Sequence, residues 1–203
     1  LEEKLAGETK PARTGIAHTR WATHGKPEEY NAHPHMDMKM RVAVIQNGII
    51  ENYRDLREEL KSRGCEFRSE TDTEVIPHLI AEELSKAELS AEFPLLEAVR
   101  SVVKRLEGAF AIAVICADYP DELIVARQQA PVVLGFGQGE FYCASDTPAL
   151  IPYTRAVLNL ENGEIARMTP IGVEIYNVEG QRLKKKPRTL DVNPVMVEKQ
   201  GFK

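Results

Sequence analysis

Residues 15–25 of this chain read G-I-A-H-T-R-W-A-T-H-G, and a polar loop continues from them to His35. The stretch concentrates side chains that bind polar ligands, namely Arg20, Trp21, Thr23 and His24. Four of the five histidines and the single tryptophan lie between residues 18 and 35. A solvated loop has no use for so many rings, guanidinium and hydroxyl groups, and loops often carry function. We therefore interpret this stretch as a binding surface.

The composition is that of an ordinary folded protein. With 203 residues, 43% hydrophobic and 28% charged, the chain can form one large domain with a full core or two small ones. The formal net charge of −5 argues against non-specific nucleic-acid binding, which needs a basic face. No apolar run approaches the length of a membrane span, so we expect no membrane partner.

The three cysteines, Cys65, Cys116 and Cys143, have neither disulfide nor zinc-ribbon spacing. Cys116 and Cys143 stand in apolar surroundings and are expected to be buried thiols. Unpaired thiols indicate a reducing compartment, so we expect a cytoplasmic protein. The chain begins at Leu1 with neither initiator methionine nor signal peptide, and it reads as the inside of a longer polypeptide.

The apolar pattern predicts two early strands and a long later run of strands. The early ones cover residues 14–19 and 41–46, and the second is expected to stop at Asn47-Gly48. The later strands are predicted at 109–116, 122–127, 131–135, 140–144, 155–158, 163–168 and 172–176. Strands, then helices, then many strands favour the α+β class with mostly antiparallel sheet.

Three helices are expected between the early and late strands. One covers about 52–63, and a third about 94–106. Between them, Thr71 and Glu74 have the spacing of a capping box that opens the second helix. Pro77 would lie too deep for the first turn of that helix and should kink it.

From Gln181 the chain becomes polar and carries the run Lys184, Lys185, Lys186, Pro187 and Arg188. Blocks of like charge tend to be unstructured, so the run is interpreted as a solvated linker. We therefore expect a domain over residues 1–180 and a linker over 181–203.

Further motifs accompany H-T-R-W-A-T-H-G, namely N-A-H-P-H from Asn31, Q-N-G-I-I-E-N from Gln46 and S-E-T-D-T-E-V from Ser69. In order and approximate spacing they resemble the glutaminase domain of the glucosamine-fructose-6-phosphate aminotransferases (isomerising). That family belongs to the class II glutamine amidotransferases. G-A-F-A-I-A-V from Gly108 and A-S-D from Ala144 agree with it, so the resemblance covers essentially the whole chain.

The resemblance implies an N-terminal-nucleophile (Ntn) hydrolase-like αββα sandwich of mostly antiparallel sheets, here truncated at the N-terminus. It makes residues 1–180 a partial type 2 amidotransferase domain and residues 181–203 a linker toward an absent sugar-isomerase domain. The implied parent enzyme is a homodimer that hydrolyses L-glutamine through a cysteine thioester. It supplies the ammonia for glucosamine 6-phosphate synthesis, and neither a metal nor another cofactor is implied.

The residue types suit this substrate, since a free amino acid needs one fixed cation and one fixed anion. Arg20 can hold the α-carboxylate in a bidentate fork, and Asp72 can take the α-ammonium. Thr23 and His24 would add hydrogen bonds to the carboxylate, and Trp21 would wall the site.

By resemblance, the side-chain amide of Asn47 and the backbone N–H of Gly48 form the oxyanion hole. His33 and His35 are assigned to a loop that closes over glutamine. Taken singly, Asn47-Gly48 could be a turn, Asp72 a carboxylate at a helix N-terminus and Arg20 a surface ion pair. The specificity comes from their occurring together.

The family's nucleophile is an N-terminal cysteine whose own α-amino group is the general base. Cys65, Cys116 and Cys143 have no free backbone amine and cannot replace it. The resemblance begins some tens of residues inside the domain, so the sequence as it stands is expected to be inactive.

Other interpretations stay open at this point. One is another class II amidotransferase, and another is a non-catalytic module that kept the glutamine pocket. A metal hydrolase using His18, His24, His33 and His35 is less favoured, because no pair has the helical spacing of a zinc site.

Overall fold

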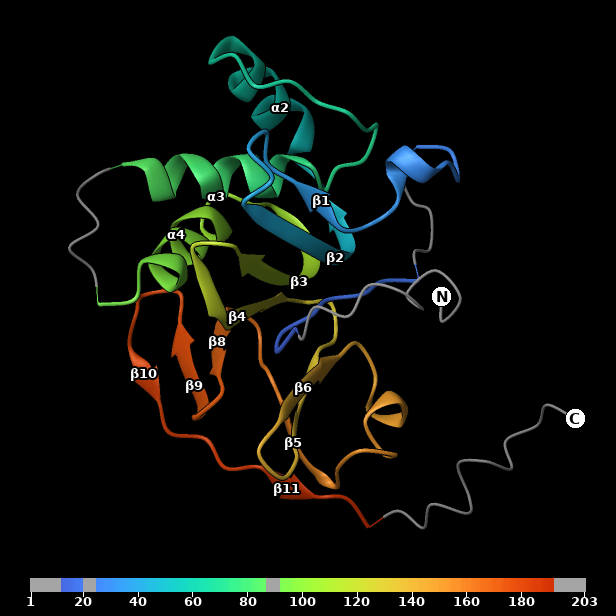
Figure 1. The fold of residues 1–203 in the computed structure, drawn as a ribbon, viewed down its shortest axis with the longest axis vertical. Coiled ribbons are helices and arrows are strands. Elements are labelled where there is room, and N and C mark those ends of the chain that lie inside the picture. Colours follow the sequence, from blue (N-terminus) through green and yellow to red (C-terminus); the bar gives the residue numbers. More distant parts are fainter. Residues whose placement is uncertain (1–11, 20–24, 87–91, 192–203) are drawn as a thin grey trace, which may run out of the picture.

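The computed structural model describes residues 12–19, 25–86 and 92–191. It consists of two antiparallel sheets, with helices covering the larger one (Figure 1). The helices are α2 (Tyr53–Ser62), α3 (Val75–Ser85) and α4 (Pro94–Val103), with short 3-10 turns η1 (Glu29–Asn31) and η2 (Thr147–Ala149). None of the helices in this part of the chain is long and apolar enough to cross a membrane.

The larger sheet has seven strands in the order β1-β2-β3-β4-β8-β9-β10. Their bounds are β1 His35–Met36, β2 Val42–Ile50, β3 Gly108–Cys116, β4 Tyr119–Gln128, β8 Glu164–Thr169, β9 Gly172–Asn177 and β10 Arg182–Leu183. All neighbours are antiparallel, and β2 pairs with β3 along its whole length, from Val42 opposite Cys116 to Ile50 opposite Gly108.

The smaller sheet has four strands in the order β11-β7-β5-β6. They are β5 (Val133–Phe136), β6 (Phe141–Ala144), β7 (Ala156–Asn159) and β11 (Arg188–Thr189). This sheet lies below the larger one in Figure 1, on the side away from the helices.

Successive side chains of a strand point to opposite faces of its sheet, and in both sheets apolar side chains are buried on each face. On β2, Val44 faces the helices, whereas Ile45 packs into the layer between the sheets. On β5, Leu134 faces the larger sheet and Val133 packs against Leu150 on the other side. The layers are therefore helix, sheet, sheet, with the segment around η2 covering the outer face of the smaller sheet. The described residues place no α-helix there, although an αββα sandwich was expected.

The predicted strands from residue 109 onward match β3 to β9, but expectations for the earlier residues are partly wrong. Residues 14–19 form no strand in the described structure, and β2 continues through Asn47-Gly48 instead of stopping there. Helix α3 begins at Val75, so Pro77 falls in its first turn, where the missing N–H costs nothing and no kink is needed.

The segment predicted as a solvated linker also differs from expectation. Strand β10 pairs with β9 in the larger sheet, β11 pairs with β7 in the smaller one, and Leu190 is buried. Between the two strands, Lys185 Nζ lies 2.7 and 2.9 Å from the oxygens of Glu164, whose side chain is buried. The basic run is therefore folded against both sheets, and its middle lysine pairs with a buried carboxylate.

Lys185→Ala should therefore lower the free energy of unfolding by about 1–3 kcal/mol, since it leaves the Glu164 carboxylate buried without its cation. Urea unfolding measures the change. Lys184→Ala and Lys186→Ala are matched controls at exposed neighbouring positions and should stay within about 0.5 kcal/mol. Equal effects of all three substitutions would contradict the arrangement.

Candidate functional site

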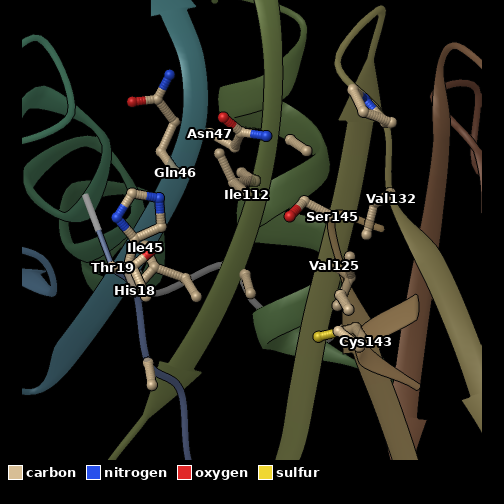
Figure 2. A pocket seen from close by; sticks show the side chains of 16 residues that line it. His18, Thr19, Ile45, Gln46, Asn47, Ile112, Val125, Val132, Cys143 and Ser145 are labelled. Carbon is tan, nitrogen blue, oxygen red and sulfur yellow. The ribbon is translucent and has the colours of Figure 1, made fainter. Parts of the chain in front are cut away.

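A cavity of about 630 Å³ lies between the two sheets (Figure 2). Its apolar wall is formed by Ala111, Ala113, Val125, Val132 and Cys143, and the polar residues that line it include His18, Thr19, Asn47 and Ser145. Asn47 on β2 and Ser145 after β6 lie on opposite walls. An apolar hollow with a few polar groups is the usual form of a small-molecule site.

Asn47 and Gly48 lie within β2, at the border of this cavity. Asn47 is exposed, so its amide is open to a ligand. Gly48 has φ 110°, and a Cβ built on it would stand 2.0 Å from the carbonyl oxygen of Ala109 on β3. Only glycine fits this position, because a side chain would meet both a strained backbone and a fixed neighbouring strand.

Side chains anchor the open edge of β2 on both sides of this pair. Within the described part of the chain, strand β1 pairs with β2 at Ala43 and Val44 only. Further along, the N–H of Gln46 donates to Nδ1 of His33 at 3.3 Å, and the N–H of Ile50 donates to Oδ2 of Asp72 at 2.7 Å. Asn47-Gly48 is thus held between two anchored amides.

The histidines of the early motifs gather beside this edge. The ring of His33 stacks on His18 with centroids 4.4 Å apart and meets His35 edge-on at 5.0 Å. His33 Nε2 lies 3.2 Å from Thr73 Oγ1, and His35 Nε2 lies 3.0 Å from Thr71 Oγ1. The motif around N-A-H-P-H and the one around S-E-T-D-T-E are therefore in direct contact. No group of residues that could hold a metal occurs in the described ranges.

The predicted site residues are partly brought together. Asn47, Gly48, His33 and Asp72 meet along β2 and the turn over residues 69–74. Asp72 is 2% exposed, and its carboxylate accepts a hydrogen bond from the N–H of Ile50 in β2. A ligand of Asp72 would share the carboxylate with this structural contact. Four other predicted residues, Arg20, Trp21, Thr23 and His24, lie outside the described residues.

The family model of the glutamine amidotransferase domain matches residues 18–152. The chain belongs to the glutamine amidotransferase domain family. The match covers the early histidine motif, the Asn47-Gly48 strand and the cavity walls up to Ala149.

Curated relatives match this amidotransferase domain over its whole length. The glutamine–fructose-6-phosphate aminotransferase (isomerizing) of Thermosynechococcus vestitus is 73% identical over 203 residues, which are 32% of that protein. The enzyme of the same name from Aquifex aeolicus is 52% identical, again with all of this chain and 33% of the relative covered. The chain spans about a third of the length of these relatives.

Solved structures of amidotransferases share the fold. Glutamine phosphoribosylpyrophosphate amidotransferase from B. subtilis, complexed with ADP and GMP, superposes with a TM-score of 0.62 at 27% identity. The match covers 79% of this chain and 34% of that one. The allosteric regulatory enzyme of purine biosynthesis gives 0.60 at 25% identity, over 73% of this chain and 31% of that one. The predicted family and the Ntn-hydrolase-like α+β fold are confirmed.

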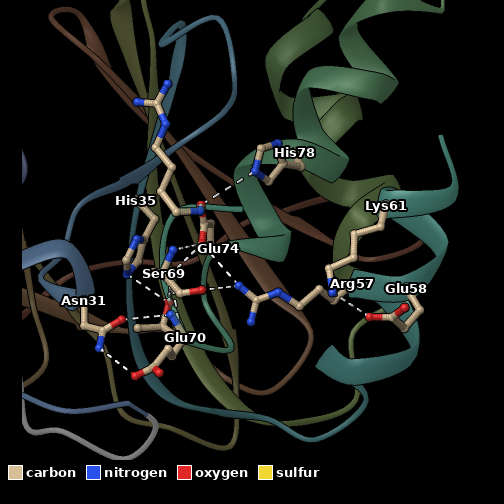
Figure 3. Close-up of polar contacts among 11 residues, drawn as sticks. Asn31, His35, Arg57, Glu58, Lys61, Ser69, Glu70, Glu74 and His78 are labelled. Carbon is tan, nitrogen blue, oxygen red and sulfur yellow. Dashed lines mark hydrogen bonds and ion pairs between the residues drawn. The ribbon is translucent and has the colours of Figure 1, made fainter. Parts of the chain in front are cut away.

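The turn that carries Asp72 in this amidotransferase domain depends on a buried carboxylate, Glu74 (Figure 3). Glu74 accepts hydrogen bonds of 2.7 Å from the N–H groups of Arg68 and Ser69, and Arg57 forms an ion pair with it at 3.5 Å. Burial alone would raise its pKa, but His78 and the donors of Arg68 and Ser69 outweigh burial and lower the pKa to about 2.

Sequence reasoning missed this role, since it placed Glu74 in a capping box with Thr71. The box does not form, because Thr71 bonds to His35 and Ser69 while Glu74 reaches back to the chain before the turn. Asn31 was also missed as a functional candidate. It is fully buried, and its amide joins Lys26 O to the carboxylate and N–H of Glu70. The contacts between Asn31 and Glu70 join residues that are far apart in the sequence. In the sequence, only the many polar residues of the N-A-H-P-H and S-E-T-D-T-E-V motifs pointed to such contacts.

The thiols of the amidotransferase domain are poor nucleophiles. Burial raises the pKa of Cys143, which lines the cavity, to about 11. Burial also raises the pKa of Cys65 and of Cys116. Because the thiolate is the reactive form, none of the three is activated at neutral pH.

Gly48→Ala should destabilise the domain by at least about 3 kcal/mol, because the methyl group would collide with Ala109 O in a strained backbone conformation. Chemical unfolding tests this expectation. Gly172→Ala is the matched control, a strand glycine with no atom within 4 Å of the added Cβ and without a positive φ. It should change the stability by less than about 1 kcal/mol. A stable, well-folded Gly48→Ala protein would contradict the close approach.

Glu74→Gln should lower the free energy of unfolding by about 3 kcal/mol at pH 7, since a carboxylate with a depressed pKa stabilises the native state above its unfolded pKa. As the pH falls from about 4.5 toward 2, the wild-type carboxylate becomes protonated and the difference should shrink. Urea unfolding at several pH values measures it. Glu58→Gln, at an exposed position, should show no such pH-dependent difference, and a constant difference for Glu74→Gln would contradict the assignment.

Proposed function

We propose that this chain is the glutaminase domain of a glutamine–fructose-6-phosphate aminotransferase (isomerising). In this proposal the domain binds L-glutamine, hydrolyses it through a cysteine thioester and supplies ammonia for glucosamine 6-phosphate synthesis. The 73% identity with part of the enzyme of that name from Thermosynechococcus vestitus supports the choice of substrate. The geometric support is Asn47-Gly48, held by anchored amides at the border of a cavity.

The charged ends of glutamine would be held by a cation and an anion. Asp72 is fixed by the N–H of Ile50, two residues along β2 from Gly48, and is proposed to take the α-ammonium. Arg20 is proposed to take the α-carboxylate, because its guanidinium makes bidentate pairs with carboxylates. Thr23 and His24 would add hydrogen bonds at the same end, and Trp21 would close the wall.

The tetrahedral intermediate of glutamine hydrolysis develops negative charge on the former amide oxygen. The exposed side-chain amide of Asn47 and the N–H of Gly48 are proposed as the donors to that oxygen. Donors fixed in advance stabilise this charge without reorganisation during the reaction. The anchoring of β2 on both sides of the pair supports this role.

The nucleophile in this proposal is a cysteine outside the present sequence, and the raised pKa values of the three thiols agree with that. The 203 residues alone should therefore bind glutamine without hydrolysing it. A sugar-isomerase domain of the same polypeptide is the proposed recipient of the ammonia, in a homodimer. A cytoplasmic location is proposed as well, since the cysteines are free.

Asn47→Ala in the complete gene product should lower kcat for glutamine hydrolysis by about 100-fold or more and change KM little, because an oxyanion donor acts mainly in the transition state. Released ammonia gives the rate. Ile49→Ala is a matched control on the same strand, since Ile49 is 39% exposed, and it should keep the wild-type rate.

The outcomes separate the alternatives. Glutamine binding by calorimetry without ammonia release from the complete gene product would indicate a non-catalytic binding module. Ammonia release without amino-sugar formation from fructose 6-phosphate would indicate another class II amidotransferase. Wild-type kcat in Asn47→Ala would remove Asn47 from the oxyanion hole.

A further inference from the structure

The anchor on the Gln46 side of the oxyanion pair is a closed ring of three hydrogen bonds. The N–H of Gln46 donates to Nδ1 of His33 at 3.3 Å. His33 Nε2 lies 3.2 Å from Thr73 Oγ1, and Thr73 Oγ1 donates to the side-chain oxygen of Gln46 at 2.5 Å. The ring therefore joins three segments that are far apart in the sequence.

The chemistry of the donors fixes the protons in this ring. A backbone N–H cannot accept, so Nδ1 of His33 carries no proton. The single hydroxyl proton of Thr73 goes to the Gln46 side chain, and His33 must therefore donate from Nε2. The ring requires a neutral imidazole in the Nε2–H tautomer.

The ring is not the most stable way to fill this space. Gln46 is 3% exposed, and its side-chain Nε2 has no hydrogen-bond partner among the described residues. Burying an unsatisfied amide nitrogen costs free energy, so an apolar side chain would serve stability better. Departures of this kind are expected where function needs a fixed geometry.

Thr73 follows Asp72 directly in the sequence. The two residues form hydrogen bonds with β2 on opposite sides of Asn47-Gly48, the proposed oxyanion pair. Asp72 holds the N–H of Ile50, whereas Thr73 holds Gln46. We propose that Thr73, acting through Gln46 and His33, is a positioning residue that sets Asn47-Gly48 relative to the carboxylate of Asp72. The ring thereby fixes the distance between the ammonium site and the oxyanion site. This role rests on the proposed function, because it assigns those two sites to glutamine.

The test compares Thr73→Val with Thr73→Ser in the complete gene product. Thr73→Val removes the hydroxyl at nearly constant volume and should lower kcat for glutamine hydrolysis at least about tenfold, with KM changed less than about threefold. Thr73→Ser keeps the hydroxyl and should stay within about threefold of the wild-type kcat.

The matched control is Thr154→Val. Thr154 is 9% exposed and donates its hydroxyl to Phe136 O at the smaller sheet, so the variant also loses a buried hydroxyl but leaves β2 untouched. It should lower the melting temperature and keep both kcat and KM. Wild-type kcat in Thr73→Val, or an equal loss of kcat in Thr154→Val, would overturn the positioning role.

The imidazole ¹⁵N shifts of His33 test the ring independently of activity. The wild-type chain should show a protonated Nε2, and Thr73→Val should speed hydrogen exchange of the Gln46 amide. A protonated Nδ1 would overturn the ring even in an active enzyme. Absence of glutamine hydrolysis by the wild-type protein would instead overturn the proposed function, while the ¹⁵N result would still decide whether the ring exists.

Discussion

The geometry of the candidate site depends on the buried carboxylate of Glu74. It holds the chain around Arg68 and Ser69 in a tight turn by accepting their N–H groups. Three consecutive residues of that turn then reach different neighbours: Thr71 reaches His35, Asp72 reaches Ile50, and Thr73 reaches Gln46 and His33. Because all of these contacts come from residues of one turn, a turn held rigidly by Glu74 fixes the positions of all of the contacted groups together.

The same turn explains how a strand with a partly open edge can hold Asn47-Gly48, the proposed oxyanion donors, in a fixed position. Beyond its short pairing with β1, strand β2 is contacted along its open edge by side chains rather than by another strand of the described residues. A neighbouring strand would have used every second N–H group of that edge in a ladder. Here, side chains bind the N–H groups of Gln46 and Ile50. The strand therefore stays ordered, while the border of the cavity between these residues stays available to a ligand.

Much of the fold follows from local sequence pattern, and the failures have a common cause. The strands from residue 109 to 176 were predictable because alternating apolar residues and turn signals act locally. The end of β2 was not, because Asn47-Gly48 has the composition of a turn and is kept extended by β3. The start of α3 and the folded state of the basic run were missed because side-chain contacts, which the apolar pattern does not show, accompany both. Glu74 binds the N–H groups of Arg68 and Ser69 before α3, and Lys185 binds Glu164 in the basic run.

The candidate site shows the same division. Asn47, Gly48, His33 and Asp72 could be named from motifs, whereas Gln46, Thr73, Asn31 and Glu74 act through contacts that no spacing reveals. The pairing of β2 with β3 also affects the order in which the chain can fold. Ile50 meets Gly108 only after helices α2, α3 and α4 have been made, so the β2 segment leaves the ribosome well before its partner. Non-local pairing of this kind slows folding, and an apolar strand awaiting its partner is prone to aggregation. Strand β2, which carries Asn47-Gly48, is therefore exposed to aggregation in a newly made chain until β3 has been synthesised.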